Sequence, residues 1–347
     1  MKFSDVFEDQ TKYGTKIKTD EYKEKGKHAI VDQGKKLIAG YTDLEYGLYN
    51  NVPVIIFGDH TRVIKYIDVP FFLGADGTKI LKCKVENANY KYLYYALTRE
   101  KIPDTGYNRH FKWLKEIDIK YPSVDKQDNI VKKLDKLSSI IQKRQQQLDK
   151  LDELVKARFV EMFGDSGKQV PLTEYVWFQE GPGVRSVDFT NEGTTLLTGS
   201  NINNNAITFG YKSDRHISND LANGKYAHFM CDKDDILVVS SAIDPDKFDK
   251  KVAIVNENKK YCLNTGIIRF KPDKNHLTLG YFREFLKTDY FKHQVIAEMR
   301  GIAQMHFGPS HLKQMTILLP ESIEKQIEFE NFVKQIDKSK FIYKKEL

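Results

Sequence analysis

Residues 106–137 read GYNRHFKWLKEIDIKYPSVDKQDNIVKKLDKL, and residues 301–336 read GIAQMHFGPSHLKQMTILLPESIEKQIEFENFVKQI. Both stretches carry, in one order, Gly, His-Phe, Leu-Lys, an apolar run, a single Pro and Lys-Gln opening a helical pattern. The landmarks pair as His110-Phe111 with His306-Phe307, Leu114-Lys115 with Leu312-Lys313, Pro122 with Pro320, and Lys126-Gln127 with Lys325-Gln326. A repeat of this length predicts two copies of one module, which suits a target that presents the same kind of surface twice.

The composition narrows the class of protein. A length of 347 residues leaves room for two domains, each with its own core. Three widely spaced cysteines without a C-x-x-C pair argue against a disulfide framework or a zinc site and fit a reducing cytosol. No apolar run reaches the roughly 18 residues of a membrane span, and the N-terminus lacks the apolar segment of a signal peptide. We therefore expect a cytoplasmic protein with no membrane partner and no metal site.

The net charge of +7 identifies no partner by itself. Residues 1–121 hold 21 basic and 17 acidic side chains, and residues 166–320 hold 19 and 17, so both surpluses are small. Such a balance permits a polyanionic partner through local basic patches, but many ordinary cytosolic proteins show as much.

The segment after Pro122 predicts one long helix. Residues 124–163 contain no Gly or Pro, and their apolar side chains recur at alternating three- and four-residue spacing, interrupted by Arg144 and Arg158. Gly164 provides a C-terminal stop. At ~1.5 Å per residue, this helix is a rod of roughly 60 Å. Its apolar seam needs a partner, which predicts spacer and assembly contacts at Ile130, Leu134, Leu137, Ile141, Leu148, Leu151 and Val155.

The second copy of the repeat supplies a candidate partner helix. Phe329, Val333 and Ile336 lie 199 residues after Ile130, Leu134 and Leu137, in the same register. We expect the two helices to pair antiparallel as a coiled-coil spacer; the alternative is that each packs only on its own domain. The second helix runs for only about 25 residues to Leu347, so we expect a continuation of the natural chain or another chain to complete the pairing.

The fold class is α/β, with two mixed α/β domains separated by the spacer helices and related by the internal repeat as a pseudo-twofold. Strand-like runs cover residues 236–240, 252–255 and 266–270, with helical patterns at 281–286 and 290–299; the first domain repeats this at 52–57, 80–85 and 90–98. We expect a first domain at 1–121 and a second at 166–320, with a central spacer helix at 122–165 and a second, short spacer helix at 321–347. The second domain is the longer, which predicts the same scaffold with different additions.

Motifs for catalysis are weak. Phe163–Gly167 contains G-D-S-G, but this follows a helix and predicts a cap and linker, whereas serine proteases with that motif are disulfide-rich β-barrels. Pro103-Asp104 with Asp118-x-Lys120 has the spacing of a metal-dependent nuclease, although Thr316 and Leu318 replace Asp118 and Lys120 in the second copy. A phosphate-binding loop, a methyltransferase motif and a glycine-rich cofactor loop are missing from the sequence. We expect no catalytic residues.

Polar and basic groups on loops are the candidates for binding. Gly58–Arg62 follows a strand, and residues 107–110 (YNRH) and 300–306 (RGIAQMH) precede the repeated strand. Arg and Lys contact guanine, Asn and Gln contact adenine, and Ser and Thr contact either. Each position taken alone is better explained as a solvated loop residue, whereas for the whole set, in matching places of both modules, the two explanations are about equal. The predicted DNA contacts are His60, Thr61, Arg62, Asn108, Arg109, His110, Ser240, Ser241, Arg300, Gln304 and His306.

The ordered landmarks at Gly106–Gln127 and Gly301–Gln326 resemble those of the DNA-specificity subunit of type I restriction-modification systems. Three further stretches resemble the same family: the helix at Ile130–Asp165, Val170-Pro-Leu-Thr, and LLTGSNINN at Leu196–Asn204. The resemblance covers essentially the whole chain. One departure from the family pattern is the short second helix.

This resemblance implies two domains that each read half of a split site in double-stranded DNA, held apart by antiparallel spacer helices. It also implies methyltransferase subunits and endonuclease/translocase subunits as partners, which would carry S-adenosylmethionine, ATP and Mg²⁺, so that this chain needs no cofactor. The alternatives are a fused restriction or modification enzyme and a coiled-coil interaction protein with no DNA role.

Overall fold

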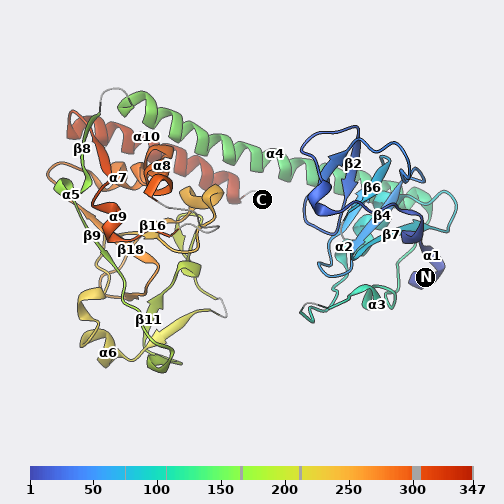
Figure 1. The fold of residues 1–347 in the computed structure, drawn as a ribbon, viewed down its shortest axis with the longest axis horizontal. Coiled ribbons are helices and arrows are strands. Elements are labelled where there is room, and N and C mark those ends of the chain that lie inside the picture. Colours follow the sequence, from blue (N-terminus) through green and yellow to red (C-terminus); the bar gives the residue numbers. More distant parts are fainter. Residues whose placement is uncertain (75, 107, 165–166, 211–212, 299–305, 346–347) are drawn as a thin grey trace. The chain divides into compact units, whose positions relative to one another are not determined.

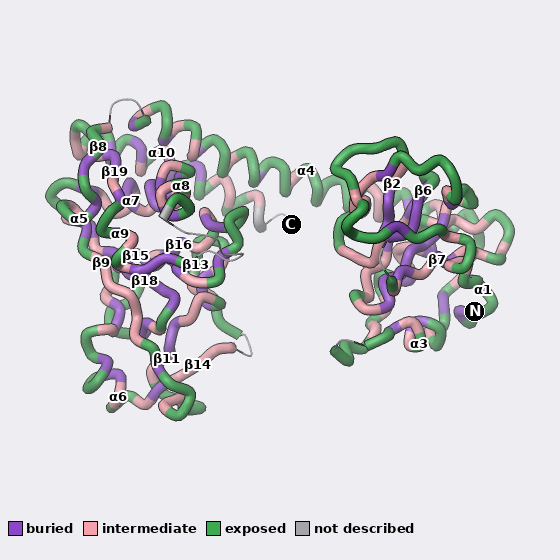
Figure 2. The backbone as a smooth tube through the Cα atoms, viewed as in Figure 1, coloured by how far each residue is buried: buried purple, intermediate pink, exposed green. Residues whose placement is uncertain are grey.

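A computed structural model describes residues 1–74, 76–106, 108–164, 167–210, 213–298 and 306–345 (Figure 1). The chain divides into two compact units, Met1–Lys143 and Arg144–Leu347. Each has its own buried core on the strands, whereas exposed residues predominate along the middle of the long helix α4, Val124–Phe163 (Figure 2). No helix in the described part of the chain combines the length and the apolar character needed to cross a membrane.

The first unit is built on a four-stranded antiparallel sheet. Its order is β1-β7-β4-β5, and a second sheet of order β3-β2-β6 contains a parallel pair, β2 with β6. The strands of these two sheets are β1 Phe7–Asp9, β2 His28–Val31, β3 Gly40–Thr42, β4 Val54–Gly58, β5 Ile64–Ile67, β6 Phe71–Leu73 and β7 Thr78–Cys83. The helices are α1 Phe3–Val6, η1 Thr11–Tyr13, η2 Thr19–Glu21, α2 Tyr90–Arg99 and α3 Phe111–Leu114.

Strand β4 is buried on both faces because it separates two cores. Successive side chains of a strand point to opposite sides. Ile55 and Phe57 therefore pack in the core that contains residues of α2, while Val54 and Ile56 pack against residues of the β3-β2-β6 sheet. The VPVIIF run reads as a continuous apolar stretch for this reason.

The second unit repeats the topology of the first. Its sheet of order β9-β18-β15-β16 is again antiparallel throughout, and β11 again pairs antiparallel with β14 and parallel with β17. The strands of these two sheets are β9 Val176–Glu180, β10 Phe189–Thr190, β11 Thr194–Leu197, β14 Arg215–Ile217, β15 Ile236–Val239, β16 Val252–Ile254, β17 Tyr261–Leu263 and β18 Ile267–Pro272. The matched sheets show that the repeat extends well beyond the stretch in which the sequences agree.

The extra length of the second unit lies in added elements. The hairpin β12 Ile202–Asn203 with β13 Ala206–Ile207, and the helix α6 Asn219–Asn223, have no counterpart in the described part of the first unit. The remaining elements are α5 Leu172–Tyr175, η3 Ser186–Asp188, η4 Gly199–Asn201, η5 Ala227–Phe229, η6 Pro245–Lys250, α7 Leu279–Phe285, α8 Asp289–Glu298 and α9 Pro309–Leu312. The same scaffold with different additions is what the sequence predicts.

The closing strand of the repeat differs between the copies. In the second unit, β19 Thr316–Leu319 pairs with β8 Lys168–Pro171 as a regular two-stranded sheet. In the first unit, the equivalent segment forms only an isolated bridge between Lys2 and Asp118. Met1 and Phe3 also bond to this segment through their backbone atoms, and α1 begins at Phe3.

The helix α10, Ile323–Lys345, lies alongside the C-terminal half of α4 (Figure 1). Arg158 pairs with Glu328 at 3.1 Å, Asp152 pairs with Lys340 at 2.6 Å, and the Arg144 guanidinium lies over the Tyr343 ring at 4.8 Å. Partner numbers rise along α10 as they fall along α4, so the predicted antiparallel pairing is confirmed in this unit.

The seam of α4 differs in detail from the predicted heptad. Phe159 and Phe163 are buried at 2 % and 1 % exposure, whereas the extrapolated heptad places Arg158 and Met162 there. A straight helix drifts by about 20° per heptad against a 3.5-residue repeat, so the buried face moves off the predicted positions. Of the predicted seam, Leu148, Val155, Phe329, Val333 and Ile336 are buried, Leu134 and Leu151 are half-buried, and Ile130, Leu137 and Ile141 are exposed.

Candidate nucleic-acid interface

The loop after β4 is held by two backbone hydrogen bonds. The Asp59 N–H donates to the Gly77 carbonyl at 2.7 Å, and the His110 N–H donates to the Asp59 carbonyl at 2.8 Å. Gly77 has a φ of +87°, a conformation that favours glycine. These bonds bring the loop at residues 58–62 together with residues 108–110 of the second predicted loop of the first unit.

The second unit repeats this arrangement after β15. The Ser240 N–H donates to the Gly266 carbonyl at 2.8 Å, and the Phe307 N–H donates to the Ser240 carbonyl at 2.9 Å. Gly266 has a φ of +80°. The backbone N–H that bonds to the strand end therefore belongs to Phe307 in the second unit and to His110 in the first. The two His-Phe pairs of the sequence repeat thus differ by one residue in their structural position. We call each pair of bonds a strand-end clamp.

Two predicted contacts belong to the clamps themselves. The His110 side chain is fully buried and its Nδ1 lies 3.0 Å from the Asp59 carbonyl, while the Asp59 carboxylate accepts the Phe111 N–H at 2.7 Å. Ser240 is also fully buried, and its hydroxyl has no partner in the described part of the chain. Neither side chain is exposed to solvent in this structure, and both residues take part in the clamps through their backbone atoms.

The remaining predicted residues of the first unit are more accessible. Arg62 has a φ of +61° and forms an ion pair with Asp104 at 2.7 Å, so its guanidinium is engaged within the unit. His60 is half-buried, whereas Thr61, Asn108 and Arg109 are exposed.

Gln33, which is not among the predicted DNA contacts, connects the loops of the first unit. Its Nε2 donates to the Asp76 carbonyl at 2.7 Å and its Oε1 accepts the His60 N–H at 3.1 Å. The Thr61 hydroxyl donates to the Gln33 carbonyl at 2.6 Å. One amide thus fixes the loop after β2 against the loops that follow β4 and precede β7. The available signal was a glutamine two residues after a strand, in the polar stretch DQGKK.

Exposed cations lie on the loops near Gln33 in the fold or sequence. Lys35 and Lys36 lie in the same loop as Gln33, and Arg109 is exposed on the clamped loop. The pKa of Asp76 is lowered first by a hydrogen bond from Lys16 and further by the nearby charge of Arg109. Cations on loops are suited to DNA phosphates, and exposed amides and hydroxyls such as those of Asn108 and Thr61 are suited to base edges.

The equivalent loop of the second unit, between β11 and β14, is fixed by Asn201. Its Oδ1 accepts the Thr198 N–H at 2.9 Å, and its Nδ2 donates to Asp214 at 2.8 Å and to the Thr208 carbonyl at 3.2 Å. Asn201 is fully buried. Both units therefore use a carboxamide in the loop after the equivalent strand, β2 or β11, to shape a polar loop.

Of the remaining predicted contacts in the second unit, the structure describes only Ser241 and His306. Ser241 is half-buried and His306 is exposed. Arg300 and Gln304 lie outside the described residues.

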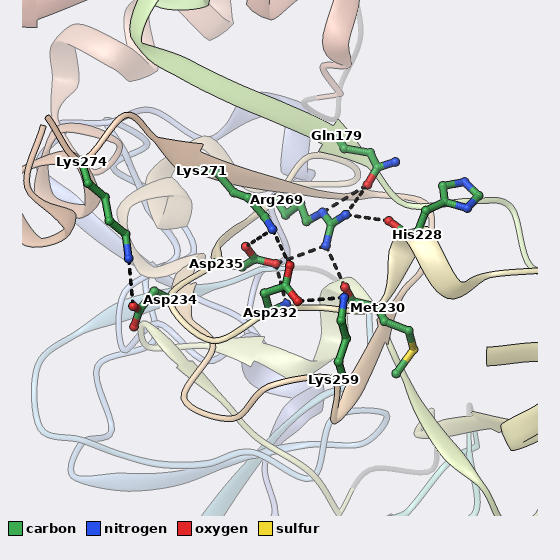
Figure 3. Close-up of polar contacts among 10 residues, drawn as sticks. All are labelled: Gln179, His228, Met230, Asp232, Asp234, Asp235, Lys259, Arg269, Lys271 and Lys274. Atoms are coloured by element: carbon green, nitrogen blue, oxygen red, sulfur yellow. Dashed lines mark hydrogen bonds and ion pairs between the residues drawn. The ribbon is translucent and has the colours of Figure 1, made fainter. Parts of the chain in front are cut away.

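A polar cluster on β18 supports the second unit (Figure 3). The Arg269 guanidinium, 5 % exposed, pairs with Asp235 at 3.2 Å and donates to Gln179 on β9 at 2.7 Å. Lys259 and Lys271 bond to Asp232 and hold the pKa of that carboxyl at about 2. Arg269 also donates to the carbonyls of His228 and Met230, so the cluster joins the main sheet to the segment that follows α6. The sequence does not predict this cluster, because its members are far apart along the chain.

The nuclease-like spacing does not gather into a ligand set. Asp104 is paired with Arg62, while Asp118 and Lys120 are exposed. Among the described residues, no group of three or more His, Cys, Asp or Glu side chains could hold a metal ion. The Asp and Ser of the G-D-S-G motif fall at 165 and 166, outside the described residues.

Comparisons with known proteins identify the family. The chain matches the type I restriction modification DNA specificity domain over residues 1–152 and 171–347. No curated protein matches the chain.

Three solved structures are similar to the chain, and the first shares its fold. One is the S subunit of a type I restriction-modification system from M. genitalium, with 18 % identity, a TM-score of 0.50, and coverage of 100 % of this chain and 91 % of that one. An HsdS subunit from Thermoanaerobacter tengcongensis has 14 % identity and a TM-score of 0.42, over 99 % of this chain and 90 % of that one. A chain from a structure titled for complex assembly of the type I R-M system has 12 % identity and a TM-score of 0.49, over 99 % and 92 %.

The family match spans both units, each of which carries the same sheet and the same strand-end clamp. The chain therefore belongs to the DNA-specificity family of type I restriction-modification systems, and it is a DNA-recognition subunit of such a system.

Proposed function

We propose that the chain recognises a bipartite, asymmetric DNA site, with each unit reading one half. The observation that carries this proposal is the pair of strand-end clamps, which present loops of different sequence and length on one shared framework. A shared framework explains why both units bind the same kind of polymer. Different loops explain why the two half-sites would differ.

Within the first unit, Lys35, Lys36 and Arg109 would contact phosphates and position the duplex, while Thr61 and Asn108 would contact base edges. In the second unit, Ser241, Arg300, Gln304 and His306 would play the corresponding roles. Phosphate contacts provide most of the salt-dependent affinity, and base contacts provide the sequence preference.

The remaining parts of the proposal concern domains and partners. The target-recognition domains would be residues 1–121 and 166–320, and the spacer helices, residues 122–165 and 321–347, would bind methyltransferase subunits and through them endonuclease subunits in the cytoplasm. S-adenosylmethionine, ATP and Mg²⁺ would be bound by those subunits, and this chain would have no catalytic site of its own.

An exchange of residues 1–121 for those of a relative tests the half-site assignment. The source strain carrying the exchanged gene should methylate a motif in which one half changes and the other stays the same, as read from its methylated genome. A change in both halves would show that the units do not read independently. If deletion of the gene leaves every methylated motif intact, the whole proposal fails.

A further inference from the structure

In the first unit, a lysine supports the loop between β2 and β3, which carries Gln33. The Lys65 Nζ on β5 donates to the Asp32 carbonyl at 2.8 Å and lies 3.5 Å from the Asp32 Oδ1. That same Oδ1 accepts the Gly34 N–H at 2.8 Å. Asp32 and Gly34 flank Gln33 in the sequence, so the ammonium and the carboxylate together hold the backbone on both sides of the carboxamide.

In the second unit, a lysine supports the equivalent loop, between β11 and β14. The Lys251 Nζ donates to the Ile202 carbonyl at 2.9 Å and to the Asn203 Oδ1 at 2.7 Å. The Asn203 Nδ2 in turn donates to the Ser200 carbonyl at 2.6 Å. Ile202 and Ser200 flank Asn201, so the backbone is again held on both sides of the carboxamide.

The two lysines come from equivalent strands but from different positions. The Gly58 N–H donates to the Val63 carbonyl, and the Val239 N–H donates to the Lys251 carbonyl. Gly58 and Val239 each directly precede the central residue of a strand-end clamp. Lys251 therefore occupies the position of Val63, two residues before that of Lys65. Side chains two residues apart along a strand point to the same side, so both positions can reach the loop from one side of the sheet.

The first of these ammonium groups is well covered by the protein. The Lys65 side chain is 3 % exposed and that of Asp32 is 22 % exposed. Burial lowers the pKa of Lys65, and the charge of Asp32 opposes this effect. A buried ammonium is costly unless its donors are occupied, so the bonds to the loop are what stabilise Lys65 in this place.

We propose that Lys65 and Lys251 are positioning residues for DNA recognition, and that each fixes the reading loop of its own unit and thereby the base preference at one half-site. This inference rests on the proposed function and deepens it, because it names residues that act through the loops of Gln33 and Asn201. Neither lysine is among the predicted DNA contacts. Without the ammonium, the backbone on both sides of the carboxamide would lose its support.

Competition binding with duplexes altered in one half-site or the other tests this assignment. Lys65→Met should reduce discrimination at one half-site by on the order of tenfold, which is comparable with one mismatched base pair, and Lys251→Met should do so at the other. The slope of log affinity against log salt should stay unchanged in both variants, because no phosphate contact is lost. A loss at the same half-site in both variants, or a uniform weakening on all duplexes, would overturn the proposal.

Two further variants separate the hydrogen bond from a general effect of substitution. Lys251→Arg keeps a charged donor beside the Ile202 carbonyl and should retain the half-site preference of the unchanged chain. Lys250→Met, a matched change at the exposed neighbouring position, should retain it as well. Equal losses in Lys251→Arg and Lys251→Met would rule out positioning through this bond. Lys251 is only half-buried, so its variants carry the test even if Lys65→Met does not fold.

Amide hydrogen exchange tests the support of the loop without DNA. In Lys65→Met, the Gly34 and His60 N–H groups should exchange faster by about tenfold or more, since a hydrogen bond to a charged group contributes at least that factor, while the amides of β4 should exchange at the rate of the unchanged chain. Unaltered exchange at Gly34 and His60 would contradict the role of Lys65. A chain without preference at either half-site would overturn the proposed function, and with it the role in recognition, even where the exchange rates change as expected.

Discussion

The Gln326 Oε1 accepts the backbone N–H of Thr278 at 2.8 Å, and the Gln127 Oε1 accepts the N–H of Asn89 at 3.2 Å. Thr278 and Asn89 are the N-caps of α7 and α2. The repeated Lys-Gln thus has a structural cause, since the glutamine in each copy is buried and joins the spacer helix to a helix of its unit. The repeat that looks like a functional motif is partly a joint between elements.

The first prediction tests this joint. Gln326→Ala should leave the Thr278 N–H without a partner and reduce the free energy of unfolding by about 1–3 kcal/mol, because a buried unpaired donor loses its hydration as well as its bond. Urea unfolding monitored by circular dichroism measures the change. Lys325→Ala is the control, since its ion pair with Glu321 is exposed and contributes at most about 1 kcal/mol. Equal losses in the two variants would contradict this role.

The second prediction concerns the aromatic contact between α4 and α10. Phe159→Ala should lower the free energy of unfolding of the second unit by about 3–5 kcal/mol, because it removes a ring that touches Tyr281, Phe285 and Phe329. The neighbouring Val160→Ala should have little effect, since Val160 is 63 % exposed. Denaturant titration of both variants decides the matter, and a small loss for Phe159→Ala would mean that the helices are held by their ion pairs instead.

The third prediction separates positioning from phosphate contact in the first unit. Gln33→Ala should release the 58–62 loop and reduce discrimination at one half-site by on the order of tenfold, comparable with the effect of one mismatched base pair. Competition binding with duplexes altered in one half-site or the other measures this. Preference at the second half-site should remain.

Lys36→Ala serves as the comparison for Gln33→Ala. Losing one phosphate contact should weaken binding to all duplexes alike and reduce the slope of log affinity against log salt by about 1. If Gln33→Ala behaves in this same uniform way, Gln33 acts as a general binding residue and does not position a reading loop.

The fourth prediction concerns pH. The pKa of Asp232 is about 2 because Lys259 and Lys271 bond to its carboxylate, whereas an unfolded aspartate titrates near ~3.9. Because the pKa is lower in the folded state, the ionised Asp232 stabilises the protein at every pH above the pKa of the unfolded state. This contribution is lost as the pH falls through the folded pKa of about 2. Asp232→Asn should therefore lower the urea midpoint at neutral pH and approach the unchanged chain in acid. Glu192→Gln is the control, because Glu192 is exposed. This variant should change the urea midpoint little, both at neutral pH and in acid.

The sequence by itself determined the two modules, the long helix and the antiparallel partner helix. Periodicity and the order of landmarks report which faces are apolar, and this information is local. The heptad extrapolated to Arg158 and Met162 failed where the buried face drifted to Phe159 and Phe163, since small angular differences accumulate along a helix.

Only the tertiary structure decided which residues are available at the strand ends. His110 and Ser240 have the residue types of DNA contacts, yet the clamps bury both, and the amides that organise the loops are Gln33 and Asn201. The sequence pattern of a polar side chain is the same whether the side chain bonds to the backbone or faces solvent. That choice depends on which distant segment packs beside the residue.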